Sequence, residues 1–368
     1  MINKILSISL LTLSSSLLTP NNPTGIISTV AGGGKPGYNG DGIKATTAQL
    51  NENSGVAVDD SGNVYIADSQ NNRIRKVYKK NGKIATIAGT GEAGFRGDGG
   101  PATDAQLTYP ICVRVDGSRN VYFSDAGNAA IRKIDATTGK ISTLAGTGQE
   151  GFGGDSGKAT NAYLHYPVGI CIDKNGNLFI ADQSNNVIRK IDAASGIITT
   201  VAGSHKAGRF GDGGPAKLAQ LNNPTGVAVD NSGKIFIADF KNNLVRMVNE
   251  NGIISTLIGT GDTLFNGFTG NADTMHLFNP AGVAVDSYGN LFIADAGNGV
   301  VREVLAGTKK VLPVTGTNND GFNGDGGLAT HAQVRYPFDI AIDKTNNVFI
   351  ADLGNSRVRK ITIPVARQ

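Results

Sequence analysis

The stretch NNPTGVAVDNSGKIFIADFKNNLVRMV, residues 222–248, holds three short apolar runs separated by turn residues. The runs PTGVAV, KIFIAD and LVRMV are rich in Val and Ile, whereas Asn, Asp, Ser and Gly stand between them. Runs of five or six such residues with this punctuation are typical of β-strands joined by hairpins. The stretch therefore predicts a small antiparallel sheet.

The same stretch is written six times along the chain. The tripeptide IAD, or FSD in one copy, ends at aspartates spaced by 57 residues, with one interval of 56. These aspartates are Asp68, Asp125, Asp182, Asp239, Asp295 and Asp352. A fixed period of this length indicates one supersecondary unit stacked on its own copies. Six copies fill nearly all of the 368 residues, which leaves no room for a second domain of ordinary size.

Each unit also contains a fourth apolar run. In the first unit the runs are residues 55–59, 64–68, 73–77 and 83–88. Four strands per unit and six units predict an all-β fold, a six-bladed β-propeller of four-stranded antiparallel blades. Blades in such a ring are covered on both faces, which agrees with the nearly continuous apolar runs GVAV and VYIA.

The two ends of the repeat array complement each other. Residues 25–32, GIISTVAG, copy a fourth strand, while residues 358–363, VRKITI, copy a third strand. The last blade is therefore one strand short unless the N-terminal segment supplies it. We expect the N-terminal strand to complete the last blade and close the ring, because closure removes the two exposed edges of an open array.

The first residues have the pattern of a secretory signal. Lys4 precedes an apolar stretch at residues 5–18, which is too short for a comfortable membrane span. We interpret residues 1–20 as a signal peptide and residues 21–368 as one propeller, exported to the periplasm or the extracellular space. We expect a monomer without a membrane span.

Net charge and cysteine usage narrow the choice of partners. A formal charge of +4 and the absence of Trp do not favour binding to nucleic acid. The two cysteines, Cys112 and Cys171, fall on the innermost strands of neighbouring units. We expect these strands to lie too far apart for a disulfide, so that both residues are buried free thiols.

Three polar residues recur in every unit: the Asp of the IAD tripeptide, an Asn three residues later and an Arg seven residues later. The residues of an active site come together at one place in a protein, whereas residues with a structural role can recur in every blade. We therefore expect Asp68 and its copies to accept backbone N–H bonds in the following turn. Asn71 should adopt a left-handed turn conformation, and Arg75 should lie between blades and bind carbonyls or carboxylates.

The Gly-rich loop between units could suggest a nucleotide or calcium site. Residues 89–94 and 146–151 fit G-x-G-x-x-G, but a strand follows instead of the helix that a dinucleotide fingerprint needs. An aspartate recurs in this loop, at Asp41, Asp98, Asp155, Asp212 and Asp325, with Phe268 in the fifth unit. One carboxylate per loop is too few for calcium, so we expect a turn role and no cofactor, with calcium at one or two loops as the alternative.

The positions where the sixfold pattern breaks are the candidate ligand-binding residues. They gather around the start of each innermost strand, in a segment that most copies write like LNNPTG and that should ring one mouth of the central channel. The candidates are Glu52, Tyr109, Arg114, His165, Tyr166, Arg335, Tyr336 and Asp339. Arg114 and Asp339 replace small residues near the axis, so the two charges are expected to face each other across the channel. Drift on a solvated surface is the alternative explanation of the group.

The four histidines do not suggest a metal site. A zinc lyase in the channel would need three convergent His ligands and an open position. His165, His276 and His331 occur in comparable loops, but they are not in register with one another. We therefore expect no bound metal.

The repeat resembles that of NHL-repeat proteins. The resemblance is carried by residues 222–248 and their copies, covers about residues 25–363, and includes the Gly-rich loop at residues 94–103. Similar long repeats occur in exported bacterial proteins and in teneurin-like proteins. The resemblance implies a six-bladed propeller that is most often used for binding, in a group that also includes RNA-binding modules and a zinc-dependent amidating lyase. It does not imply one activity.

We favour a binding scaffold for a protein, peptide or glycan ligand at one channel face over an enzyme. The alternative is a metal-dependent lyase or hydrolase with its site in the central channel. RNA binding would need a basic face, and a net charge of +4 over 368 residues does not indicate one.

Overall fold

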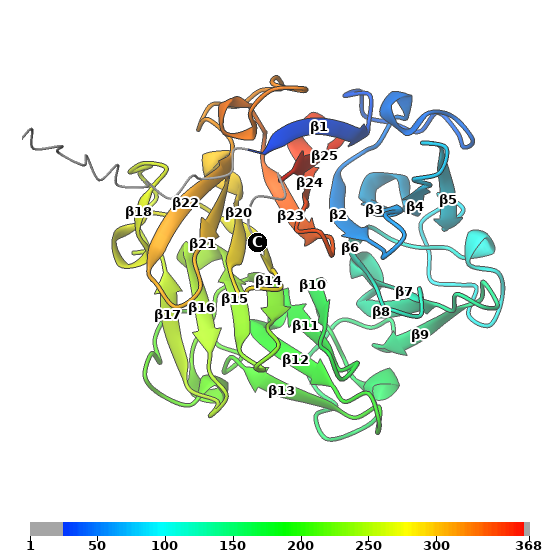
Figure 1. Ribbon diagram of the computed structural model, residues 1–368. Coiled ribbons are helices and arrows are strands. Elements are labelled where there is room, and N and C mark those ends of the chain that lie inside the picture. Colours follow the sequence, from blue (N-terminus) through cyan, green and yellow to red (C-terminus); the bar gives the residue numbers. More distant parts are fainter. Residues whose placement is uncertain (1–24, 364–368) are drawn as a thin grey trace, which may run out of the picture.

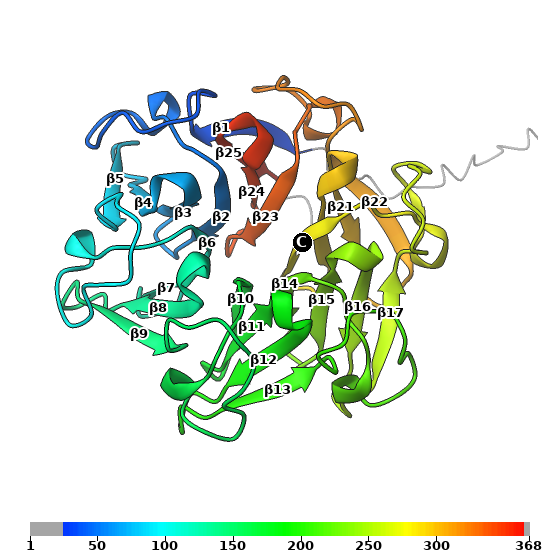
Figure 2. The same ribbon diagram turned by 180° about the vertical axis from the view of Figure 1, so that it is seen from behind.

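The computed structural model describes residues 25–363, in which six sheets surround a central axis (Figure 1 and, from behind, Figure 2). Neighbouring strands within each sheet pair antiparallel. The predicted all-β, six-bladed propeller is therefore confirmed. The interpretation of residues 1–20 as a signal peptide falls outside the described residues.

The first five blades follow one another along the chain. Blade 1 contains β2 (Asn53–Val58), β3 (Val64–Asp68), β4 (Arg73–Val77) and β5 (Ile84–Ala88). Blade 2 contains β6 (Pro110–Val115), β7 (Val121–Asp125), β8 (Ala130–Ile134) and β9 (Ile141–Ala145). Blade 3 contains β10 (Pro167–Ile172), β11 (Leu178–Asp182), β12 (Val187–Ile191) and β13 (Ile198–Ala202). Blade 4 contains β14 (Pro224–Val229), β15 (Ile235–Asp239), β16 (Leu244–Val248) and β17 (Ile254–Ile258).

Blade 5 has an additional short edge strand and blade 6 is completed from the other end of the chain. Blade 5 contains β19 (Pro280–Val285), β20 (Leu291–Asp295), β21 (Val300–Val304), β22 (Lys310–Thr315) and the edge strand β18 (Gly270–Asn271). Blade 6 contains β23 (Pro337–Ile342), β24 (Val348–Asp352), β25 (Arg357–Thr362) and β1 (Ile26–Ala31). The first strand of each unit, from β2 to β23, lies innermost.

One turn of 3-10 helix follows the second strand of each unit, and another lies in each Gly-rich loop. The first group is η2 (Ser69–Asn71), η4 (Ala126–Asn128), η6 (Gln183–Asn185), η8 (Phe240–Asn242), η10 (Ala296–Asn298) and η12 (Leu353–Asn355). The second group is η1 (Ala45–Thr47), η3 (Ala102–Asp104), η5 (Ala159–Asn161), η7 (Ala216–Leu218), η9 (Ala272–Thr274) and η11 (Ala329–His331). Each loop turn places an Ala against the apolar layer between two blades.

The ring closes through the pairing of β1 with β25, as predicted. Ile26 lies opposite Thr362 and Thr29 lies opposite Arg359. Ile27 is fully buried and packs against the apolar layer between blades 5 and 6. The N-terminal strand is therefore an integral part of the last blade.

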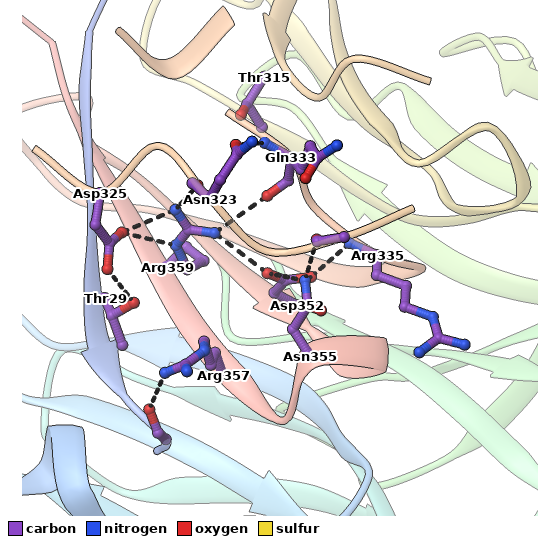
Figure 3. A network of polar contacts seen from close by, with 12 residues as sticks. Thr29, Thr315, Asn323, Asp325, Gln333, Arg335, Asp352, Asn355, Arg357 and Arg359 are labelled. Carbon is purple, nitrogen blue, oxygen red and sulfur yellow. Dashed lines mark hydrogen bonds and ion pairs between the residues drawn. The ribbon is translucent and has the colours of Figure 1, made fainter. Parts of the chain in front are cut away.

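Every blade contains a buried cluster built on the repeated Arg, shown for blade 6 in Figure 3. Arg359 binds Asp352 at 3.4 Å and the loop residue Asp325 at 2.8 Å. The Asn355 side chain donates to the Asp352 carboxylate at 2.9 Å. Burial raises the pKa of Asp352 to about 6, although Asn355, the amide of Arg335 and Arg359 act in the opposite direction. The structural role expected for the repeated Arg is confirmed.

The roles expected for the repeated Asp and Asn need correction. Asp68 accepts the backbone N–H of Asn51, which precedes the innermost strand, and not one in the following turn. The reason is geometric, because antiparallel pairing places the end of β3 beside the start of β2. Asn71 uses its side chain to donate to Asp68, while the left-handed conformation belongs to the next residue, Asn72, with φ 48°.

The repeated loop aspartate joins the same clusters. Asp98 binds Arg132 at 2.6 Å and accepts the N–H of Thr143 on the outermost strand of blade 2. The turn role expected for this aspartate is therefore corrected, because its carboxylate lies within reach of the buried Arg and the outermost strand and connects the two. In blade 5, Phe268 replaces the Asp, and the residue equivalent to Thr143 is Pro313, which has no N–H to donate. Blade 5 therefore lacks both the loop carboxylate and the backbone N–H that this carboxylate binds in blade 2.

Both thiols are free, as expected. Cys112 is buried and Cys171 is partly exposed on the innermost strand of blade 3. Burial raises the pKa of the Cys112 thiol to about 12, so it stays protonated at neutral pH. Within residues 25–363, none of the helical segments has the length and apolar character needed to cross a membrane.

Candidate functional site

The residue before each innermost strand has a left-handed backbone conformation. These residues are Glu52, Tyr109, Tyr166, Asn223, Asn279 and Tyr336, with φ between 49° and 53°. Asn adopts this conformation readily, whereas most other residues pay about 1–2 kcal/mol for it. Since the innermost strands all start from the same face of the ring, the six residues surround one end of the channel. We call this set of six residues the tyrosine mouth.

Two tyrosines and a glutamate make direct contact on blades 1 to 3. The Tyr109 hydroxyl donates to the Glu52 carboxylate, which also accepts from the Gln70 side chain at 3.3 Å. The rings of Tyr109 and Tyr166 lie 6.4 Å apart between centroids with an interplanar angle of 28°. Burial, reinforced by Glu52, raises the pKa of Tyr109 above its ordinary value, so the phenol is neutral at physiological pH.

A second aromatic pair comes from blade 6. The rings of Tyr336 and Phe338 lie 6.5 Å apart at an interplanar angle of 26°. Phe338 also packs against a small apolar cluster of Ile111, Ala126 and Val168 on blades 2 and 3, as do Tyr109 and Tyr166. Phe338 of blade 6 therefore meets residues from blades 2 and 3 near the axis.

A charged pair lies beside Phe338. Arg114 binds Asp339 through two bonds, Nη1 to Oδ2 at 2.8 Å and Nη2 to Oδ1 at 3.0 Å. Asp339 also accepts the N–H of Val56 at 3.0 Å, so the pair links blades 6, 1 and 2. Burial opposes the charge on Arg114, but Asp339 outweighs it and raises the arginine pKa. The facing pair expected from the sequence is present.

A cavity of only about 10 Å³ lies among Phe338, Arg114 and the neighbouring strands, so the channel is narrow at this level. Beyond the pair, the channel opens into a vestibule of about 280 Å³ at the opposite face. Its walls carry mainly Val, Ile and Ala side chains, with Arg114 as the charged group and Cys171 as the thiol among the lining residues. Arg114 lines both this vestibule and the narrow part of the channel.

Two of the candidate residues point away from the tyrosine mouth. The His165 imidazole lies 3.5 Å from Glu150 in the Gly-rich loop. The Arg335 guanidinium lies 3.6 Å from Asp320 in the corresponding loop of blade 6, and Figure 3 shows its side chain directed away from Arg359. Both occupy the position just before the left-handed residue, and that position faces the outer loops.

The histidines lie apart. His276 bonds the carbonyl of Leu264, and His205 bonds the carbonyl of Asn185 and stacks on Phe152. Among residues 25–363, no group of three or more His, Cys, Asp or Glu side chains is arranged to hold a metal ion. The site offers an aromatic and hydrogen-bonding surface, in which the Tyr109 hydroxyl is paired with the Glu52 carboxylate.

The left-handed position was missed by the sequence interpretation, although a signal for it exists. Asn stands there in blades 4 and 5, and Asn is one of the few residues that visit this conformation routinely. In blade 4 the following residue is Pro224, which disfavours the right-handed helical region for Asn223. The contacts of Phe338 with blades 2 and 3 left no comparable signal, because they depend on distances across the ring.

The strand order, the closure and the repeated clusters define a six-bladed propeller of the NHL type. The chain belongs to the teneurin NHL domain family. The family profile matches residues 20–96, 147–210 and 206–266, which together make up more than half of the sequence.

Curated relatives share the repeat region. The chain is 28% identical over 332 residues to SUPPRESSOR OF QUENCHING 1 of Arabidopsis thaliana, covering 87% of this chain and 31% of the plant protein. It is 28% identical over 327 residues to human NHL repeat-containing protein 2, covering 78% of this chain and 43% of the human protein. The chain thus spans less than half the length of these relatives.

Solved structures show the same fold at low sequence identity. A protein of unknown function from Bacteroides thetaiotaomicron superimposes with a TM-score of 0.69 at 18% identity, covering 92% of this chain and 76% of that one. An auxiliary nutrient binding protein from the same organism gives a TM-score of 0.65 at 14% identity with the same coverage. At these identities the likeness concerns the fold alone.

Proposed function

We propose that this chain is a binding module that captures a protein, peptide or glycan ligand at the tyrosine mouth. The observation that carries the proposal is the left-handed conformation of Tyr109, Tyr166 and Tyr336. Asn223 and Asn279 show that the fold accepts a less costly residue at this position. Strained residues concentrate at functional sites, where the strain is retained because the side chain is needed. Three bulky rings in this conformation therefore support a ligand surface.

A rigid scaffold agrees with this function. The mouth sits on the starts of six innermost strands, each paired within a closed ring. Binding residues are commonly placed on loops that a rigid scaffold positions. The solved nutrient binding protein of similar fold makes binding a natural use of this architecture, although it does not specify a ligand.

We also propose that the protein is an exported monomer. Lys4 and the apolar residues 5–18 support an export signal within residues 1–20. Mass spectrometry of the protein recovered from the medium or periplasm would find a mature N-terminus near residue 21. Recovery of the intact chain from the cytosol would contradict export.

The experiment for the binding site uses the substitution that the fold itself provides. Tyr166→Asn and Tyr336→Asn install the residue that blades 4 and 5 carry in the same conformation. A panel of oligosaccharides and peptides is screened by thermal shift, since a ligand that binds only the folded state raises the melting temperature. A ligand of the mouth should stabilise the native protein and fail to stabilise the two variants.

A matched control removes a tyrosine far from the mouth. Tyr288 is 56% exposed and lies in the hairpin turn between β19 and β20, at the opposite end of the innermost strand. Tyr288→Asn should leave the ligand response intact. A ligand response that survives Tyr166→Asn and Tyr336→Asn would place binding elsewhere and contradict the site.

A further inference from the structure

The tyrosine mouth contains only a few types of side chain, which indicate one class of ligand. This inference rests on the proposed function. Its six left-handed positions carry three Tyr, two Asn and one Glu, without a cationic side chain among these described residues. Tyr336, Glu52, Tyr109 and Tyr166 follow one another on blades 6, 1, 2 and 3. Amide residues occupy the equivalent positions of blades 4 and 5. One side of the rim is therefore aromatic and the other is amidic.

The aromatic side is a platform, not a box. The rings of Tyr109 and Tyr166 are stacked at an interplanar angle of 28° with their centroids 6.4 Å apart, so they are widely offset and their faces are nearly parallel. Tyr336 and Phe338 repeat this arrangement at 26° and 6.5 Å. A quaternary ammonium group is recognised by aromatic faces that surround it as a cage. A flat platform instead matches the flat C–H face of a sugar ring.

Glu52 supplies hydrogen-bond acceptors beside the platform. An ionised carboxylate has about four lone-pair positions, and the structure fills two of them with Tyr109 and Gln70. The remaining positions can accept hydroxyl groups from a ligand. Both protein donors hold the carboxylate in place before a ligand arrives, which reduces the ordering cost of binding.

Phe338 lies at the floor of the mouth. Together with Tyr109 and Tyr166 it packs against the cluster that contains Ile111 and Val168, and the cavity between Phe338 and the neighbouring strands has a volume of about 10 Å³. We therefore expect a ligand to lie across the mouth. A chain of linked rings can cover successive aromatic residues in this way, whereas a side chain of a peptide has no pocket to fill.

We propose that the tyrosine mouth binds a neutral oligosaccharide, with sugar rings stacked on Tyr166 and Tyr109 and hydroxyl groups donating to Glu52. The platform provides apolar contact for the C–H faces. The carboxylate and the amides on the facing side provide acceptors and donors for hydroxyl groups.

The test is a glycan array of neutral oligosaccharides, followed by calorimetric titration of the full chain with those that bind. Tyr166→Asn should weaken binding about tenfold or more, because it removes one stacking surface. Glu52→Gln retains the shape and one acceptor but loses the charge, so it should weaken binding by a smaller factor. Tyr288→Asn, remote from the mouth, should leave the affinity unchanged.

Two results would overturn the inference in distinguishable ways. If no neutral oligosaccharide binds, but tetramethylammonium or a peptide binds and loses affinity with Tyr166→Asn, the glycan class is wrong and the binding function stands. If neither these probes nor any oligosaccharide shows a response that depends on Tyr166, the proposed function fails as well. An oligosaccharide that binds Tyr166→Asn as tightly as the native protein also overturns the site.

Discussion

The side chains at the tyrosine mouth show how a repeat protein acquires a specific surface. Asn at the left-handed position is the low-cost choice, and blades 4 and 5 keep it. Tyr109, Tyr166 and Tyr336 depart from it and accept unfavourable backbone energy of about 1–2 kcal/mol each. Tyr109 and Tyr166 pack against the same apolar cluster as Phe338, so the strained residues and Phe338 belong to one surface.

The pair of Arg114 and Asp339 gives a prediction at the residue scale. Arg114→Ala should lower the free energy of unfolding by about 3 kcal/mol, because the Asp339 carboxylate is only 7% exposed and loses its counter-charge. The double change Arg114→Ala with Asp339→Gly installs the residues found in most other blades and should recover most of that loss. Chemical denaturation of the native protein, the two single variants Arg114→Ala and Asp339→Gly, and the double variant measures the coupling.

The outcome of that cycle is decisive. If the double variant is no more stable than Arg114→Ala alone, the pair does not act as a unit. The pairing itself was predictable from the sequence, because each charge replaces a small residue near the axis. The orientation of the His165 and Arg335 side chains was not predictable. Adjacent residues of this segment face opposite ways, one toward the mouth and the other toward the outer loop.

At the scale of the blade, the repeated Asp, Asn and Arg form a cross-brace between the strands and the Gly-rich loop. Each Arg is buried and reaches both the Asp of its own strand pair and, except in blade 5, the loop Asp. In blade 5 the loop lacks the carboxylate, and among the described residues the Arg302 Nη2 atom is buried without a hydrogen-bond partner. The loop carboxylate therefore contributes to the buried cluster of the blade.

The loop aspartate gives a prediction at this scale. Asp98→Ala should lower the free energy of unfolding by about 1–2 kcal/mol, because Arg132 and the Thr143 amide each lose an acceptor. The contacts with Arg132 and Thr143 lower the Asp98 pKa against the effect of burial. Its stabilisation should therefore be present above about pH 4 and be lost as the pH falls below that value.

The control is an exposed acid of the same loop. Asp104→Ala should change the stability by less than about 0.5 kcal/mol, since Asp104 bonds only the neighbouring Thr103 side chain. Equal effects of the two changes, measured by denaturation at pH 7, would contradict a specific role for Asp98. The pH dependence of the difference between native protein and Asp98→Ala provides the second readout.

The strands of each blade were predictable because turn residues separate short Val- and Ile-rich runs at a fixed period. In the first unit the predicted runs at 64–68 and 73–77 coincide with β3 and β4. The left-handed residue was assigned one position early, to Asn71, because Asn recurs there in every unit. The position itself carries Asn72 in blade 1 but Ala129 in blade 2 and Ser356 in blade 6, so residue preference does not identify it.

At the scale of the whole molecule, closure joins the two ends of the chain in one sheet. The closure was predictable because the two terminal segments are complementary fragments of one repeat. The narrowing of the channel was not predictable, since it depends on the contacts of Phe338 and Arg114 with other blades. The candidate site could therefore be assigned to a region of the ring, but not to a surface of known depth.

The closing strand gives the prediction for the whole ring. Ile27→Asp should lower the free energy of unfolding by more than about 3 kcal/mol, because it places a charge in the apolar layer between blades 5 and 6. Ser28→Asp puts the same group on the adjacent, exposed position and should change it by less than about 0.5 kcal/mol. Thermal and chemical denaturation measure both. Similar stability of the two variants would show that the ring does not depend on β1.

The register of β1 against β25 also decides how the molecule responds to force. Ile26 is paired with Thr362, so the outer ends of the two strands lie next to each other. A force applied to these adjacent strand ends would break the hydrogen bonds between β1 and β25 one after another. It would not load all of these bonds at the same time, as a shearing force would. A molecule tethered at both ends would therefore open at this seam first, while the other five blades keep their internal pairing.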